Sequence, residues 1–261
     1  MRLVKRDIKI IKDLACFGFI LTSQAAKLYG MNLKVAQRRL RKLCSADYLR
    51  KINLATTKQG RSPSLYYLGE KGASYLGIAV SKPRQTLATT HSIANNSHLI
   101  SVSRAFVNHD DITCKLLPEH LMRQTQQEII PDGAFSLSRV EKSALFLFEN
   151  CAGTEIIKSP SCHDDIENKI ISYIEMYKEN KVEFYNKLLQ KEFNHFRILY
   201  VTNNQYSRFL AIKDLIREHD QEGFIWLAMM KDFEKDFTGN IWHISTDSIK
   251  HSIIGKQPCQ K

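Results

Sequence analysis

The stretch LKVAQRRLRKLCSADYL at residues 33–49 decides how the first part of the chain folds. Its apolar residues recur at helical spacing and make one stripe: Leu33, Ala36, Leu40 and Leu43. Its basic and polar residues occupy the other faces: Lys34, Gln37, Arg38, Arg41 and Lys42. Asn32 stands where an N-cap is expected, so the pattern predicts a helix from Leu33 to about Ala46 with one packed side and one cationic side.

Two helices are predicted before this stretch, and two strands and a short helix after it. The predicted helices cover residues 7–17, 23–30 (with Thr22 as N-cap) and 70–76, and the strands cover residues 48–52 and 65–68. The tip between the strands carries Lys58 and Arg61. Three helices and a basic hairpin follow the order of a winged helix-turn-helix, whose third helix presents side chains to the DNA major groove.

The charge of the chain is concentrated in this part. The 261 residues contain 38 Lys and Arg against 27 Asp and Glu, and residues 1–84 hold 18 of these basic residues but only four of the acidic ones. The first third therefore carries a net charge of +14 and the remainder −3, which predicts a polyanionic partner at the first third. We expect a DNA-binding domain over residues 1–84 and a second domain over residues 85–261, and prefer DNA binding to the alternative that the charges only solvate a surface helix.

Composition excludes several other classes of protein. With 43% hydrophobic and 25% charged residues the chain is an ordinary globular protein, and apolar runs such as residues 144–148 are far shorter than the roughly 18 residues that span a bilayer. The six cysteines lie singly and the nine histidines lack ligand spacing, so neither predicts a zinc site. We expect a cytoplasmic protein with reduced thiols and no membrane contact.

Two carboxylates close neighbouring predicted strands in the second part. Asp132 follows Pro131 at the start of one hairpin arm, and Glu149 ends the apolar run at residues 144–148. Such a pair can hold Mg²⁺, which prefers oxygen ligands and assists phosphodiester hydrolysis by neutralising charge and activating water. Helices expected over residues 162–178 and around 209–216 alternate with strands at 196–201 and 224–228, which predicts a mixed α/β sheet.

The order of these motifs resembles a known family. Pro131-Asp132 followed by Phe148-Glu149 is similar to the PD-(D/E)XK restriction-endonuclease-like core. A winged helix followed by His91 to Asn96, then PDG, LFLFENCAGTE and KIISYIEMYK, resembles the replication-relaxation family and the related C-type plasmid mobilisation relaxases. The resemblance covers residues from about 7 to about 217, and implies a mobile-element protein that acts on double-stranded DNA at an origin, with other mobilisation proteins as further partners.

One position departs from the nuclease pattern. The lysine that this pattern places two residues after the acidic ligand is Cys151 here, and a neutral thiol cannot stabilise charge on phosphorus as an ammonium does. Lys158 or Lys169 would have to supply the cation, and we take Asp132, Glu149 and Lys169 as the candidate catalytic set. Two alternatives stay open: a Mg²⁺-dependent nicking enzyme, or a winged-helix transcription regulator whose inactive nuclease-like domain serves homodimerisation.

Overall fold

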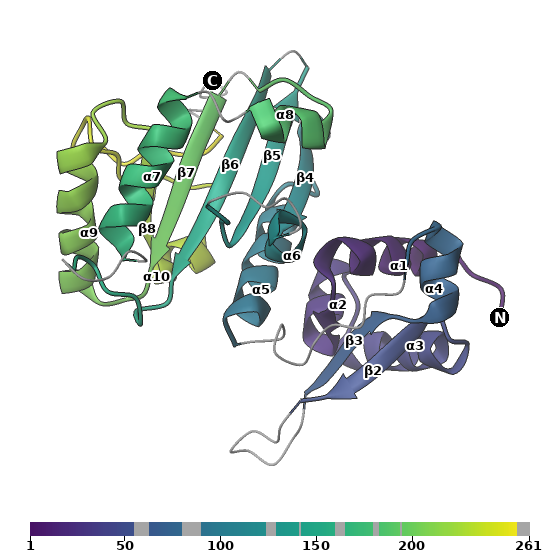
Figure 1. The fold of residues 1–261 in the computed structure, drawn as a ribbon. Helices are drawn as coiled ribbons and strands as arrows, with labels where there is room; N and C mark the ends of the chain where they lie inside the picture. The colour runs from purple at the N-terminus through teal and green to yellow at the C-terminus, as the bar shows by residue number, and fades with distance from the viewer. Residues whose placement is uncertain are drawn as a thin grey trace, which may run out of the picture. The chain divides into compact units, whose positions relative to one another are not determined.

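The computed structural model describes residues 1–54, 63–79, 90–123, 129–140, 142–159, 165–179, 183–193 and 195–254. The chain divides into two compact units (Figure 1). The first unit holds residues 1–104 and 117–126, and the second holds residues 105–116 and 127–261. The predicted boundary near residue 84 lies outside the described residues. Helices and two separate sheets make this a mixed α/β protein, which confirms the predicted class.

The first unit contains helices around a small antiparallel sheet. Its elements are α1 (Lys5–Phe17), β1 (Ile20–Leu21), α2 (Thr22–Leu28), α3 (Leu33–Ser45), β2 (Leu49–Asn53), β3 (Ser64–Leu68), α4 (Glu70–Leu76), most of α5 (Thr90–Ala105) and α6 (Glu119–Met122). The strand order is β1-β3-β2, with Ile20 opposite Tyr66 and Arg50 opposite Tyr67. The third strand, β1, was not predicted from the sequence.

The predicted caps and core of this unit are partly confirmed. Asn32 caps α3, because its side chain accepts a hydrogen bond from the backbone N–H of Val35 at 2.9 Å. The prediction that Thr22 caps α2 is wrong: Thr22 is already helical, and the Gln24 side chain accepts from the N–H of Leu21 instead. Leu33 was predicted in the buried stripe of α3 but is exposed, since it is the first residue of the helix.

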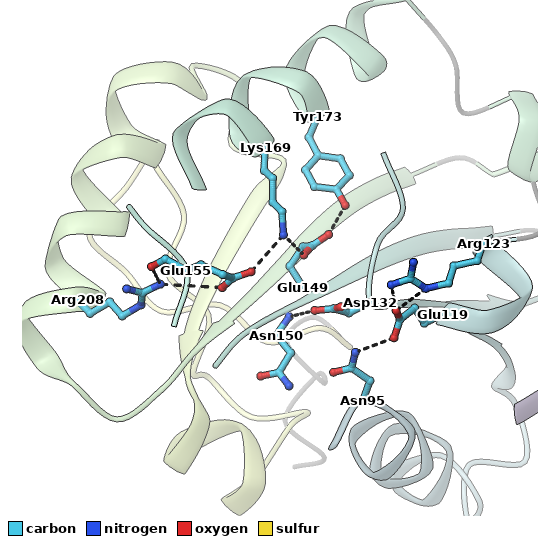
Figure 2. Close-up of polar contacts among 10 residues, drawn as sticks. All are labelled: Asn95, Glu119, Arg123, Asp132, Glu149, Asn150, Glu155, Lys169, Tyr173 and Arg208. Carbon is cyan, nitrogen blue, oxygen red and sulfur yellow. Dashed lines mark hydrogen bonds and ion pairs between the residues drawn. The ribbon is translucent and has the colours of Figure 1, made fainter. Parts of the chain in front are cut away.

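Buried amides attach α5 to the rest of the first unit. The side chain of Asn96 donates to the backbone carbonyls of Phe17 and Phe19, at 3.4 and 3.2 Å, where α1 has ended. The neighbouring Asn95 donates to the buried carboxylate of Glu119, at 3.3 Å (Figure 2). Both asparagines therefore satisfy buried polar groups, which gives the His91–Asn96 motif a structural role in this unit.

The second unit is built on a five-stranded sheet with the order β4-β5-β6-β7-β8. Its elements are β4 (Thr113–Pro118), β5 (Gly133–Arg139), β6 (Lys142–Cys151), α7 (Ile166–Lys178), α8 (Glu183–Leu189), β7 (His195–Thr202), α9 (Tyr206–His219), β8 (Ile225–Met229) and α10 (Met230–Lys235). Strands β5 and β6 are antiparallel, whereas β6, β7 and β8 are parallel.

Neighbouring residues of β6 point to opposite faces of this sheet. Phe148 contacts Phe233 of α10, whereas Glu149 reaches Tyr173 of α7. Helices α7 and α9 pack side by side on the same face as Glu149 (Figure 1). The fold therefore places Glu149 beneath α7, close to the carboxyl ends of the parallel strands.

Within the described part of the chain, no helix has both the length and the apolar character needed to cross a membrane. The four described cysteines, Cys16, Cys44, Cys114 and Cys151, form no disulfide among themselves.

Candidate functional site

The basic face predicted on α3 is exposed in the first unit. Its five side chains are Lys34, Gln37, Arg38, Arg41 and Lys42, and all five line one surface pocket. The opposite side of the helix, formed by Ala36, Leu40 and Leu43, is fully buried. The face therefore presents four cations and one amide to solvent from a helix whose position is fixed by packing.

The structure extends this face beyond the predicted residues. Lys71 of α4 lines the same pocket, and a second pocket beside it, bordered by Arg38 and Lys42, adds Lys5 and Arg6 of α1. These three residues come from elements other than α3 and were not predicted from the sequence. Lys58 and Arg61, predicted on the hairpin tip, lie outside the described residues.

Arg39 differs from its basic neighbours. It donates two hydrogen bonds to the carboxylate of Asp7, whose side chain is fully buried and also accepts the backbone N–H of Val4 at 2.9 Å. This pair ties the first turn of α1 to α3 and neutralises the charge of Arg39, which lines the second pocket but is already paired with a carboxylate. The two consecutive arginines of α3, Arg38 and Arg39, are therefore not equivalent.

The two predicted carboxylates of the second unit lie side by side. Gly133 pairs with Phe148, so Asp132, just before β5, lies next to Glu149 on β6. Asp132 accepts the backbone N–H of Asn150 at 2.8 Å, which fixes its side chain at this edge of the sheet (Figure 2). The structure therefore brings together the Asp and Glu that were predicted from strand ends 17 residues apart.

Glu149 is buried in an environment that disfavours its charge. Its side chain is 3% exposed and accepts a hydrogen bond from the hydroxyl of Tyr173. Burial, and next the negative charge of Asp132, raise the pKa of Glu149 from 4.5 to about 8, although Lys169 and Tyr173 act in the opposite direction. Tyr173 is itself fully buried, and its raised pKa keeps it a hydrogen-bond donor. The carboxyl group of Glu149 is therefore largely protonated near neutral pH.

Lys169 of α7 supplies a cation at this site. Its ammonium lies 3.7 Å from Glu149 and 3.1 Å from Glu155, a residue of the loop after β6 (Figure 2). Burial by itself lowers the pKa of Lys169, but the two carboxylates more than offset this and raise its pKa above the ordinary value. The other candidate, Lys158, instead binds Glu167 at 2.7 Å. Of the two lysines, the structure brings only Lys169 to the predicted carboxylates.

The loop after β6 is held so that Glu155 faces this site. Gly153 adopts a φ of +99°, and a Cβ there would lie 2.2 Å from the side chain of Asn203. The buried carboxylate of Asp165 accepts from the backbone N–H of Ser159 at 2.7 Å, and Arg208 of α9 donates to the carbonyl of Glu155 at 2.7 Å. These contacts fix the backbone on both sides of Glu155.

Cys151 stands at the position where the nuclease pattern predicts a lysine. It is buried at the end of β6, and burial raises the pKa of its thiol well above the ordinary value. The neutral thiol therefore supplies no charge to the site. Glu155, Tyr173 and Arg208 were not predicted as site residues. Arg208 could have been found from the sequence, because it lies in the first turn of the helix that follows the parallel strand β7.

Asp132 and Glu149 fit a divalent cation such as Mg²⁺, which usually binds through one or two carboxylates and takes its other ligands from water and phosphate. The fit follows from the mutual repulsion of these carboxylates, since an added cation would remove the cost of ionising Glu149. Among the described residues, the set of three possible ligand atoms within 4.8 Å of one another is Glu167, Glu218 and His219. That set adjoins the Lys158 ammonium, and we read it as a surface ion-pair network.

Comparison with known proteins identifies the family but no individual relative. Neither a curated protein nor a solved structure matches the chain. A family model described as replication-relaxation matches residues 11–189, which include α3, Asp132, Glu149 and Lys169. The match covers more than half of the 261 residues and indicates a role in the replication or mobilisation of a plasmid or other mobile element. The chain therefore belongs to the replication-relaxation family.

Proposed function

We propose that the first unit is a winged helix-turn-helix that binds double-stranded DNA at an origin of its mobile element. The observation that carries this proposal is the five-residue face of α3, exposed on one side of a helix whose other side is buried. Arg and Lys on such a face neutralise backbone phosphates, and Arg38 or Gln37 can also read base edges in the major groove. Lys71, Lys5 and Arg6 widen the surface that faces the phosphates.

Duplex binding by an Arg38→Ala/Arg41→Ala variant tests this function. We expect weaker binding to a duplex carrying the element's own origin, and a plot of log affinity against log salt that is less steep by about two units, since each phosphate contact contributes about 0.9. The control is Lys187→Ala/Arg217→Ala, which removes two exposed cations of the second unit. Unchanged affinity in the α3 variant, or equal loss in the control, would exclude α3 as the binding face.

We further propose that the second unit is a restriction-endonuclease-like domain that nicks DNA. The supporting observation is the cluster of Asp132, Glu149 and Lys169 at one edge of the sheet. Asp132 and Glu149 would hold Mg²⁺, which when bound supplies charge neutralisation and a more acidic water. The Lys169 ammonium would stabilise negative charge on phosphorus, the task that a thiol at position 151 cannot perform. Tyr173 orients Glu149 through its hydrogen bond.

A plasmid relaxation assay tests nicking. Supercoiled plasmid with the element's origin is incubated with protein, with Mg²⁺ or with EDTA, and the open-circular product is measured on a gel. We expect nicking that requires Mg²⁺ and is abolished by Glu149→Gln, while Glu175→Gln, an exposed carboxylate of α7, keeps wild-type activity. Nicking that survives Glu149→Gln would place the chemistry elsewhere.

The alternative is a winged-helix transcription regulator with an inactive second unit. Cys151 favours it because the usual lysine is absent, whereas the position of Lys169 favours catalysis. A regulator would bind the origin duplex with the same dependence on Arg38 and Arg41, yet leave the plasmid supercoiled with and without Mg²⁺. The two assays therefore separate the alternatives.

A further inference from the structure

The carboxylate of Glu155 lies between two cations from different helices (Figure 2). One oxygen, Oε1, lies 3.1 Å from the Lys169 ammonium, and the other, Oε2, lies 4.0 Å from Nη2 of Arg208. Arg208 is 9% exposed, and its Nη2 donates to the Glu155 carbonyl at 2.7 Å. The Glu155 carboxylate therefore makes a close contact with Lys169 and a longer one with Arg208.

Two buried polar atoms around the Glu155 carboxylate have no hydrogen-bond partner within the described part of the chain. Among the described residues, Oε2 of Glu155 and Nε of Arg208 both lack a hydrogen-bond partner although both are buried. A buried polar group without a hydrogen-bond partner is energetically unfavourable. The Glu155 backbone is held by Arg208 and by the loop contacts to α7, and its carboxylate lies at hydrogen-bond distance from Lys169 but 4.0 Å from Arg208. An anion not attached to this backbone could contact both cations.

We propose that Lys169 and Arg208 form a binding subsite for a phosphodiester group of DNA, beside Asp132 and Glu149, and that the Glu155 carboxylate occupies this subsite until DNA binds. The assignment of the phosphate to DNA rests on the proposed function. Phosphate oxygens are strong acceptors for arginine and lysine, and two cations from separate helices can hold one phosphate from two directions. Arg208 lies in the first turn of α9, a 14-residue helix whose N-terminal end also favours an anion.

This arrangement makes Glu155 a competitor of the substrate. A phosphate that enters the subsite must displace a carboxylate already paired with Lys169, so isolated phosphate binds weakly. A DNA strand held by the rest of the protein overcomes this competition because its binding is supported elsewhere. Glu155 thereby prevents Lys169 and Arg208 from binding free anions of the solution.

The direct test measures inorganic phosphate binding to the full chain by titration calorimetry. Glu155→Gln keeps the size of the side chain and removes its charge, so we expect phosphate to bind at least about tenfold more tightly, since one competing charge at this distance contributes more than the free energy of a tenfold change. The gain should disappear in Glu155→Gln/Arg208→Gln. Glu175→Gln, which removes an exposed charge from α7, should bind phosphate as the wild type does.

A second probe distinguishes DNA from free phosphate. In the Arg38→Ala/Arg41→Ala background, a short single-stranded oligonucleotide should also bind more tightly after Glu155→Gln. If only inorganic phosphate gains affinity, the subsite is not one for DNA. If neither probe gains affinity, or the gain persists without Arg208, the subsite is refuted.

Folding and the proposed function are controlled separately. Thermal unfolding establishes that each variant is folded, and Glu155→Asp, which shortens the side chain but keeps its charge, should give a smaller gain if Glu155→Gln does not fold. No gain in Glu155→Asp would then refute the subsite. Plasmid nicking is measured independently, so a protein that gains phosphate affinity but never nicks would refute the proposed catalysis and leave the subsite in place.

Discussion

The buried carboxyl group of Glu149 should make the stability of the second unit fall as pH rises. Burial and the charge of Asp132 raise its pKa in the folded protein to about 8, whereas the ordinary value is 4.5. A group with a raised folded pKa binds its proton more tightly in the folded state. Its contribution to stability is therefore complete below pH 4.5 and is lost as pH rises through about 8.

The size of the effect follows from one proton. Between the two pKa values the unfolded chain has lost a proton that the folded chain keeps, so the unfolding equilibrium constant grows about tenfold for each pH unit. Over the roughly 3.5 units between 4.5 and about 8 this amounts to an upper bound of about 5 kcal/mol. Glu149→Gln resembles the protonated carboxyl group in size and cannot ionise. The variant should match the wild type near pH 5 and become progressively more stable than it towards about pH 8.

Tryptophan fluorescence reports this unfolding selectively. Both tryptophans of the chain, Trp226 and Trp242, belong to the second unit, and Trp242 is fully buried. Urea unfolding of wild type, Glu149→Gln and the control Glu175→Gln would be followed at several pH values from about 5.5 to 8.5. Parallel curves for wild type and Glu149→Gln across this range would show that Glu149 is not held protonated, and would refute the reasoning.

Three further substitutions, each of which removes or adds contacts of one residue, are tested by urea unfolding. Tyr173→Phe removes a hydrogen bond that lowers the pKa of Glu149, so the pH at which stability falls should move upward; an unmoved midpoint would contradict this. Asn96→Ala leaves two buried carbonyls without their donor and should destabilise the first unit by about 1–3 kcal/mol. Asn53→Ala, an exposed position of β2 in the same unit, should change its stability by less than about 0.5 kcal/mol. Gly153→Ala should destabilise more than Gly77→Ala, because both have positive φ but only the first would meet a neighbour, at 2.2 Å; equal losses would argue against that contact.

Local signals predicted most of the elements in the first unit. Glu70–Leu76 was predicted with its observed bounds, and α3 was predicted from its apolar stripe and its cap, Asn32. The two-residue strand β1 was missed, since it exists only through pairing with β3 more than 40 residues away. Strand β4 was also missed, because its largely unburied residues give no apolar run. Elements that depend on a distant partner leave no local pattern to read.

Three residues of the candidate site were predicted from the sequence: Asp132 and Glu149 at strand ends, and Lys169 on the helix α7. Asp132 and Glu149 stand at strand ends, and adjacent strand ends meet at one edge of a sheet. Glu155 and Arg208 come to the same place because a loop folds back on α7 and because α9 begins near the end of β7. These positions depend on how loops pack, which spacing along the chain does not encode.

Cys151 lies on the same face of the sheet as the candidate site residue Glu149. Residues 149 and 151 are two apart on one strand, so their side chains lie on the same face, beneath α7. The Lys169 side chain extends from α7 towards that face, and its ammonium lies 3.7 Å from the Glu149 carboxylate. A second buried ammonium at position 151 would face it across the same small space and would repel it. The buried neutral thiol is therefore compatible with a lysine on α7, and the cation that lies beside Glu149 comes from the helix and not from the strand.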